Sequence, residues 1–381
     1  MKADVIKPVS PVRAFLRTHF ELGDARMLAM EGLRALAVVL VFAHHFATQV
    51  LSLAAPAGLS LAAATAIRNY GNLGVELFFV LSGYLIYGAL IRRPSFWKFM
   101  WRRVQRIHPA FLAVLLICVV GGLLTHSAKI PHDLGKAAVY LGANILLLPG
   151  LFPIKPVFTV AWTLSYEMFF YLSVSALVVT ARLDRRSRDV RIATILGLAA
   201  LLLTLVALHV PYVPVRMLPF FAGMLLYELD GLKTTPVPAV AGLAAPLLAF
   251  LATAVLHLSV FRPVIAAELL HTAAFFALCF SCFRMGNVAS AVFSLPPLRW
   301  LGNMSYSYYL THGFIVAGVM QLLAKQLPAG AIWLTALPVF AGTLLLAAAL
   351  YLAIEKPYSL DVKKRAAGRR SGAGLSKTAA T

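Results

Sequence analysis

The amino-acid sequence predicts an all-α polytopic membrane protein, and three observations support that prediction. The chain has 381 residues, of which 61% are hydrophobic and only 13% are charged, whereas a soluble domain carries about 25% charged residues. The apolar residues fall into repeated blocks of about 20 residues, the length that an α-helix needs to cross a bilayer. The lysines and arginines cluster in short segments between these blocks, as the positive-inside rule expects.

The charge and the cysteines argue against two other kinds of site. The net charge is +20, but the charges lie between apolar blocks, so we attribute them to membrane topology and expect no nucleic-acid partner. All three cysteines, Cys118, Cys279 and Cys282, lie in apolar blocks. The last two form a CxxC pair without further ligands, which is a poor zinc site. No metal is therefore expected.

The sequence predicts about ten transmembrane helices. The basic segments 91–106 and 182–191 and the tail after Glu355 should lie in the cytoplasm, which places both termini there. In chain order, the apolar blocks that we expect to span the membrane cover residues 30–52, 72–91, 108–126, 161–181, 192–210, 216–230, 238–257, 264–283, 304–324 and 331–353.

A weaker apolar block at 138–152 is not expected to span. Three helices lead from a cytoplasmic N-terminus to an outer loop at 127–137, and only one further crossing can reach the basic segment 182–191. Residues 138–152 and 161–181 therefore cannot both cross. The first block is short and ends near Pro149 and Gly150, which predicts a re-entrant or interfacial segment.

One membrane domain is predicted, at residues 28–358, between two basic cytoplasmic segments. Residues 1–27 precede it, and within them residues 10–27 have the pattern of a short amphipathic helix. The tail at 359–381 is rich in Gly, Ala, Ser, Lys and Arg and is expected to be disordered.

Arg34 and His45 are ionisable residues inside the first apolar block, EGLRALAVVLVFAHH. Their spacing makes three helical turns plus about 20°, so both side chains share a helix face, about 16 Å apart along the axis. Such residues usually line a bundle interior or a watery cavity. The structural alternatives are snorkelling of Arg34 to the inner headgroups and a hydrogen bond from His45 to a neighbouring helix. The shared face favours a channel lined by this helix.

The next two motifs carry one carboxylate and two guanidinium groups. Glu76, in GNLGVELFFVLSGYLI, is expected at a depth similar to that of His45, where it can orient the imidazole or simply complement the helix dipole. Arg103 and Arg106 lie one turn apart at the cytoplasmic entrance of the third span. Guanidinium groups at that spacing can clamp a phosphate, although positive-inside anchoring needs only their charge.

The later spans hold weaker candidates. Trp162 and Tyr166, in FTVAWTLSYEMFFYL, suit the interfacial aromatic belt, and Glu167 lies deeper in the same span. His312 lies within the ninth span, in NMSYSYYLTHGF. Glu355 ends the last span in YLAIEKPYSL near the inner surface, where pairing with the lysine that follows it is the alternative.

This ordered set of motifs resembles the acyltransferase 3 family of membrane O-acyltransferases. The resemblance covers about residues 28–358, and WTLSYEMFFYL is closer to the exopolysaccharide-modifying members than to the WSLSVEEQFYL of O-antigen members. The matching stretches are, in order, Arg34-x10-His45, GVELFFVLSGYLI, RRVQRIHPAF, WTLSYEMFFYL, SYSYYLTH and IEKP.

The resemblance implies a ten-helix enzyme of a bacterial inner membrane. Such an enzyme moves an acyl group, usually the acetyl group of acetyl-CoA, from cytoplasmic acyl-CoA to a hydroxyl of an extracytoplasmic glycan or lipid-linked sugar. Exopolysaccharide, lipopolysaccharide, peptidoglycan and small glycosides all fit as acceptors. Some members carry a fused C-terminal esterase-like domain, for which we expect no room in this sequence. By resemblance, Arg34 and His45 are the family's essential pair, and Arg103 and Arg106 are its RxxR pair.

We therefore expect the following reaction. Arg103 and Arg106 hold the CoA phosphates at the inner face, and the pantetheine arm passes Arg34. His45 then acts as a general base on the acceptor hydroxyl or accepts the acyl group for a short time. The remaining candidates are Glu76, expected to orient His45; Glu355, expected to line the inner entrance to the CoA site; and Trp162, Tyr166, Glu167 and His312, expected to bind the acceptor.

Three rival functions remain. A transporter or flippase for a glycan or a small metabolite also lines its pathway with polar residues, but it has no need for a phosphate clamp. The other large class of membrane O-acyltransferases pairs a late histidine with a distant asparagine, whereas the key histidine here lies in the first span. A purely structural scaffold leaves the aligned Arg34 and His45 unexplained.

Overall fold

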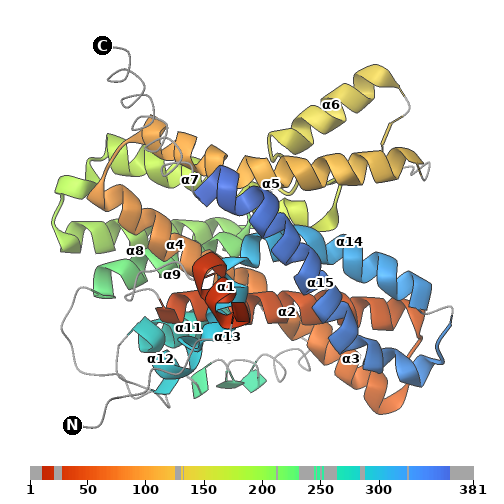
Figure 1. Ribbon diagram of the computed structural model, residues 1–381. Helices are drawn as coiled ribbons and strands as arrows, with labels where there is room; N and C mark the ends of the chain where they lie inside the picture. The colour runs from red at the N-terminus through yellow and green to blue at the C-terminus, as the bar shows by residue number, and fades with distance from the viewer. Residues whose placement is uncertain are drawn as a thin grey trace, which may run out of the picture.

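The regular secondary structure of the described residues is all helical, as the sequence predicts (Figure 1). The computed structural model describes residues 11–20, 28–124, 130–131, 133–211, 213–230, 244–245, 247–248, 251–252, 264–283, 288–323 and 326–360. The α-helices are α1 (Pro11–Phe20), α2 (Leu28–Leu53), α3 (Gly58–Gly71), α4 (Gly74–Arg92), α5 (Phe96–Leu124), α6 (Leu134–Ile145), α7 (Trp162–Thr180), α8 (Arg188–Ala207), α9 (Leu218–Asp230), α11 (Val264–Phe283), α12 (Val288–Phe293), α13 (Pro296–Asn303), α14 (Ser305–Leu323) and α15 (Ala336–Leu350).

Shorter helical segments connect or extend several of these helices. Four are 3₁₀ segments, and the last is a π-helical continuation of α15 that carries the IEKP motif. In chain order they are η2 (Thr159–Ala161), η3 (Leu183–Arg185), η4 (Val215–Met217), η5 (Ala329–Thr335) and η6 (Tyr351–Leu360).

Seven helical stretches among the described residues are long and apolar enough to cross a membrane, which supports a multi-pass protein. The count of ten and the orientation of the termini stay predictions. Most of the block expected at 238–257 lies outside the described residues, as does the tail at 359–381 apart from its first two residues. Helix α9 has only 13 residues. The seven stretches are Leu28–Leu53, Gly58–Arg92, Phe96–Leu124, Thr159–Thr180, Arg188–Ala207, Ile265–Phe283 and Ala331–Ser359.

Two helices differ from the sequence-based expectation. The expected spans leave residues 53–71 as a connection, yet this stretch contains α3, whose alanine-rich sequence favours a helix and which packs along α2. Helix α5 begins at Phe96 rather than near residue 108, so the RxxR pair lies inside the helix, ahead of its internal Pro109.

The segment at 138–152 overlaps a helix that is too short to cross, and its re-entrant or interfacial placement stays a prediction. Helix α6 has 12 residues, which is about 18 Å of helix against a hydrocarbon core of about 30 Å. It ends in turns that contain Pro149 and Gly150, and the Pro149 carbonyl accepts a hydrogen bond from the Ser165 hydroxyl of α7. This hydrogen bond ties the connection to the start of α7.

The bundle is built around α2 and α4. Helix α2 packs against α3, α4, α13 and α14, and α4 packs most extensively against α9. Gly83 of α4 and Gly223 of α9 lie at that crossing, where a Cβ on either one would collide with the backbone of the other helix. Small residues of this kind let membrane helices approach closely. Gly83 and Gly223 therefore allow α4 and α9 to pack closely.

Candidate active site

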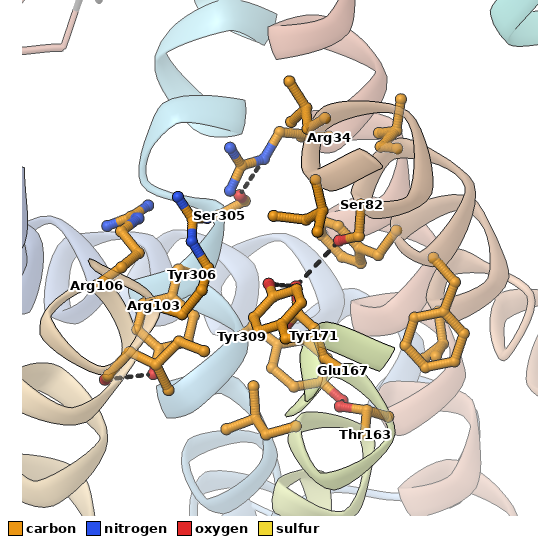
Figure 2. Close-up of a pocket in the computed structure, with 18 residues that line it drawn as sticks. Arg34, Ser82, Arg103, Arg106, Thr163, Glu167, Tyr171, Ser305, Tyr306 and Tyr309 are labelled. Atoms are coloured by element: carbon orange, nitrogen blue, oxygen red, sulfur yellow. Dashed lines mark hydrogen bonds between the residues drawn. The ribbon is translucent and has the colours of Figure 1, made fainter. Parts of the chain in front are cut away.

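A cavity lies between α2, α4, α5, α7 and α14 (Figure 2). It offers about 150 Å³ to the centres of water-sized molecules, roughly ten times what one buried water needs. Its walls are aliphatic and aromatic apart from a limited set of polar side chains. These are Arg34, Ser82, Arg103, Arg106, Thr163, Glu167, Tyr171, Ser305, Tyr306 and Tyr309.

The cavity carries a positive charge. Three guanidinium groups, from Arg34, Arg103 and Arg106, line it against the single carboxylate of Glu167. Figure 2 shows the three side chains at the same end of the cavity, contributed by α2 and α5. An excess of fixed positive charge between low-dielectric walls attracts anions.

Arg103 rests on aromatic rings. Its guanidinium carbon lies 5.4 Å from the ring centre of Phe99 and 5.9 Å from that of Tyr171, within cation–π range. Its buried Nε has no hydrogen-bond partner among the described residues. The Arg103 guanidinium is therefore positioned by contacts with aromatic rings, and its Nε–H has no partner among the described residues and can donate to a ligand.

Arg106 is held by charge. Its Nη1 lies 2.5 Å from Oε1 of Glu355, and its guanidinium carbon lies 5.7 Å from the ring centre of Tyr306. Glu355 is fully buried, and its Oε2 accepts from the backbone N–H of Ser307 at 3.1 Å and from the Ser307 hydroxyl at 2.5 Å. The carboxylate thus joins α5, α14 and η6. It fixes Arg106 in place and does not itself line the cavity.

Arg34 and Glu167 have hydrogen bonds to neighbouring helices. The Arg34 Nε donates to the Ser305 hydroxyl at 3.1 Å, which orients the guanidinium from α2 toward the start of α14. The Glu167 Oε1 accepts from the Ser82 hydroxyl at 3.0 Å and from the Tyr171 hydroxyl. Of the residues expected to bind the acceptor, Glu167 is the one that lines this cavity.

His45 lies outside the cavity lining, next to His312. The two imidazole rings meet edge-on with centroids 4.8 Å apart, and His44 packs against His45 on its own helix at 4.9 Å. The His312 Nδ1 lies 2.8 Å from the Tyr309 carbonyl oxygen. The structure therefore brings together His45 and His312, for which the sequence predicts separate roles.

Tyr309 contacts both the cavity and His312. Its side chain lines the cavity, and its hydroxyl lies 2.6 Å from the Thr163 hydroxyl and 3.1 Å from the Val160 carbonyl. Its backbone carbonyl accepts a hydrogen bond from Nδ1 of His312. A single residue of α14 thus contacts both parts of the candidate site.

Glu76 does not take the partner expected for it. Its Oε2 lies 4.0 Å from Nδ1 of His271 on α11, and Glu268 of the same helix is close enough to interact with it. All three side chains are buried. Glu76 therefore turns toward α11 and not toward His45, because α11 offers it a nearby imidazole.

Trp162 and Tyr166 also lie outside the cavity lining. Their rings meet edge-on at 5.4 Å, and the guanidinium carbon of Arg216 lies 5.4 Å from the Trp162 ring centre. Arg216, Glu268 and His271 belong to none of the motifs found in the sequence. Glu268 and His271 could have been identified by their spacing, because two ionisable residues three positions apart share a helix face within an apolar block.

The membrane domain matches a known family. The sequence model described as an acyltransferase domain matches residues 27–352, which is most of the chain. This chain belongs to the acyltransferase 3 family. It is therefore an acyltransferase by family, of a kind that transfers groups other than aminoacyl groups, as the resemblance predicts.

Several curated proteins are similar to this acyltransferase. The peptidoglycan O-acetyltransferase OatA of Listeria monocytogenes is 26% identical over 370 residues, which cover 86% of this chain and 55% of OatA. The exopolysaccharide production protein ExoZ of Rhizobium meliloti is 30% identical over 324 residues, 81% of this chain and 95% of ExoZ. A putative O-acetyltransferase of Staphylococcus aureus is 28% identical over 182 residues, 42% of this chain and 26% of that protein.

The lengths of these relatives differ. This chain spans about half of OatA but nearly all of ExoZ. No solved structure matches it.

Proposed function

We propose that this acyltransferase moves an acetyl group from cytoplasmic acetyl-CoA to a hydroxyl of an extracytoplasmic carbohydrate in a bacterial inner membrane. The observation that carries the proposal is the cavity with three guanidinium groups, Arg34, Arg103 and Arg106. Guanidinium groups bind phosphates well, because the planar fork of donors matches phosphate oxygens. CoA carries such phosphates.

Each arginine has a separate part in donor binding. Arg106 is held by Glu355 and supplies a fixed charge, while Arg103 keeps a donor available for a phosphate oxygen. Arg34 lies on the face of α2 that leads toward His45. The pantetheine arm is flexible and slender, so it can pass along this face between the apolar cavity walls and bring the thioester toward the imidazole.

His45 performs the chemistry in one of two ways. As a general base it removes the proton from the acceptor hydroxyl while that oxygen attacks the thioester. As a nucleophile it takes the acyl group and passes it to the hydroxyl. Both routes use the neutral imidazole, so the rate falls as the pH is lowered and the imidazole becomes protonated. A rate that does not change with acid would contradict both routes.

The acceptor is a glycan. Two similar proteins are named for peptidoglycan O-acetylation and exopolysaccharide production. Trp162 and Tyr166 supply the aromatic surface that a sugar ring stacks on, and Glu167 and His312 supply hydrogen-bonding groups beside the path of the acyl group.

The first test uses purified protein in detergent. We expect the wild type to bind and slowly hydrolyse acetyl-CoA. His45→Ala should bind it and lose turnover by about 100-fold or more. Arg103→Gln and Arg106→Gln should weaken binding, whereas Arg185→Gln, in the exposed η3 segment, should not.

Absence of acetyl-CoA binding by the wild type would overturn the proposal. So would equal weakening by Arg185→Gln, because the effect would then reflect total charge and not the cavity. Proteoliposomes add the direction of transfer: acetyl-CoA should support the reaction from the face that carries Arg103 and Arg106, and not from the other.

A further inference from the structure

His312 has the local geometry of a general base. Its side chain is fully buried in α14. Its Nδ1 lies 2.8 Å from the Tyr309 carbonyl oxygen and 3.2 Å from that of Tyr308. A carbonyl oxygen only accepts hydrogen bonds, so Nδ1 carries the imidazole proton. Nε2 is then a lone-pair acceptor, and it has no hydrogen-bond partner among the described residues.

His45 lacks this arrangement. Among the described residues it has ring contacts to His44 and His312 but no hydrogen bond that fixes its tautomer. Glu76, the carboxylate expected to orient it, turns toward His271. A general base is normally oriented by a third group that holds its other ring nitrogen. His312 meets that requirement through the Tyr309 carbonyl, and His45 does not.

His44 is the third imidazole of the group, and its position differs from that of His312. Its Nδ1 donates to the Arg68 carbonyl of α3 at 2.6 Å, and the side chain is half-buried. It contacts His45 but has no ring contact with His312 among the described residues. His44 thus anchors α2 to α3. His312, by contrast, contacts both His45 and Tyr309, and Tyr309 lines the cavity.

We propose that His312 is the general base of the acceptor step and that His45 is the acyl carrier. This inference rests on the proposed function and deepens it, because it divides two roles between two residues. The rings of His45 and His312 are in contact at 4.8 Å between centroids. One acceptor hydroxyl that reaches this pair is therefore within range of both an acyl group on His45 and the Nε2 of His312.

The two half-reactions balance. In the first, a nitrogen of neutral His45 attacks the thioester carbonyl, the C–S bond breaks, and the proton displaced from the imidazole passes to the CoA thiolate. In the second, the acceptor hydroxyl attacks the acyl-imidazole carbonyl while the His312 Nε2 takes the hydroxyl proton. The C–N bond breaks and that proton passes from His312 to His45. The products are the ester and free CoA, and both imidazoles end neutral.

The experiment separates acylation from deacylation. Four proteins are purified in detergent: the wild type, His312→Asn, His45→Asn and the matched control His209→Asn. His209 follows α8 and is far in sequence from both His45 and His312. Each is mixed with acetyl-CoA that carries a radiolabel on the acetyl group. Protein-bound label and released CoA are measured after rapid quenching. Each measurement is made first with water as the acceptor and then with added hydroxylamine. Hydroxylamine attacks an acyl-imidazole without the help of a general base.

We expect His312→Asn to acquire label in a burst like the wild type but to turn over about 100-fold more slowly or worse. Hydroxylamine should remove its label and restore CoA release. His45→Asn should acquire no label under either condition, and His209→Asn should match the wild type. Acetyl-CoA binding, measured in parallel, shows that each variant is folded; if His312→Asn does not bind, His312→Gln replaces it.

Other outcomes overturn the inference. If His312→Asn turns over at the wild-type rate, His312 is not the general base of the acceptor step. If this variant loses both the burst of label and turnover, His312 acts in acylation of the protein, before deacylation. An unlabelled wild type with rapid acetyl-CoA turnover removes the carrier role of His45 but leaves the proposed function standing. A wild type that neither binds nor hydrolyses acetyl-CoA overturns the proposed function itself.

Discussion

At the scale of single residues, the Arg106–Glu355 pair is the contact on which one end of the cavity depends. Removing one partner of a buried ion pair costs about 3–5 kcal/mol, because the other charge stays buried without compensation. Glu355→Gln should therefore lower the unfolding temperature in detergent and weaken acetyl-CoA binding. Asp184→Asn, in the more exposed pair with Arg185 at 3.9 Å, is the control and should change stability by about 1 kcal/mol or less.

A double variant tests whether this pair acts as a unit. Arg106→Gln with Glu355→Gln removes both charges, so its loss of stability should be smaller than the sum of the two single losses by about 0.5–3 kcal/mol. Additive losses would mean that Glu355 acts through Ser307 and not through Arg106.

Arg34 tests geometry apart from charge. Arg34→Lys keeps the positive charge but loses the planar fork that bonds Ser305 and faces the cavity. We expect acetyl-CoA turnover to fall at least tenfold while the unfolding temperature changes little. If turnover is retained, a point charge is sufficient at this position and the guanidinium has no orienting role.

At the scale of secondary-structure elements, the α4–α9 crossing leaves no room for larger side chains at its two glycines. Gly83→Val and Gly223→Val place side chains where the backbone of the facing helix already lies, so each should strongly reduce folded yield. Gly121→Ala and Gly197→Ala are the controls: both lie within helices with open space around the added Cβ. There alanine should stabilise the helix by up to about 1 kcal/mol. Unchanged yields for the valine variants would show that the helices can separate at no cost.

At the scale of the whole molecule, the predicted orientation can be tested by cysteine labelling. In a background without Cys118, Cys279 and Cys282, single cysteines replace Leu59, which is exposed at the start of α3, or Arg185 in η3. The predicted topology places residue 59 outside and residue 185 in the cytoplasm. A membrane-impermeant thiol reagent should label intact cells at 59 only, and at 185 after permeabilisation. The reverse pattern would invert every assignment of inner and outer faces.

Much of this protein follows from its sequence alone. Hydrophobic blocks of fixed length specify helices that cross a bilayer, because no other open segment satisfies its backbone hydrogen bonds in lipid. The ordered motifs identify the family, and the helical period predicts that Arg34 and His45 share a face. Local rules are sufficient for these features, because each depends on residues close together in the chain.

The tertiary structure alone decided which side chains meet. Arg106 is 249 residues from Glu355 and His45 is 267 residues from His312, so no local pattern specifies either contact. Glu76 was expected at His45 because the two lie at similar depth, but the rotation of α4 about its axis directs it to α11. Depth follows from position along a helix, whereas rotation is set by packing against neighbouring helices. This is why the sequence identified candidate residues while the fold determined their partners.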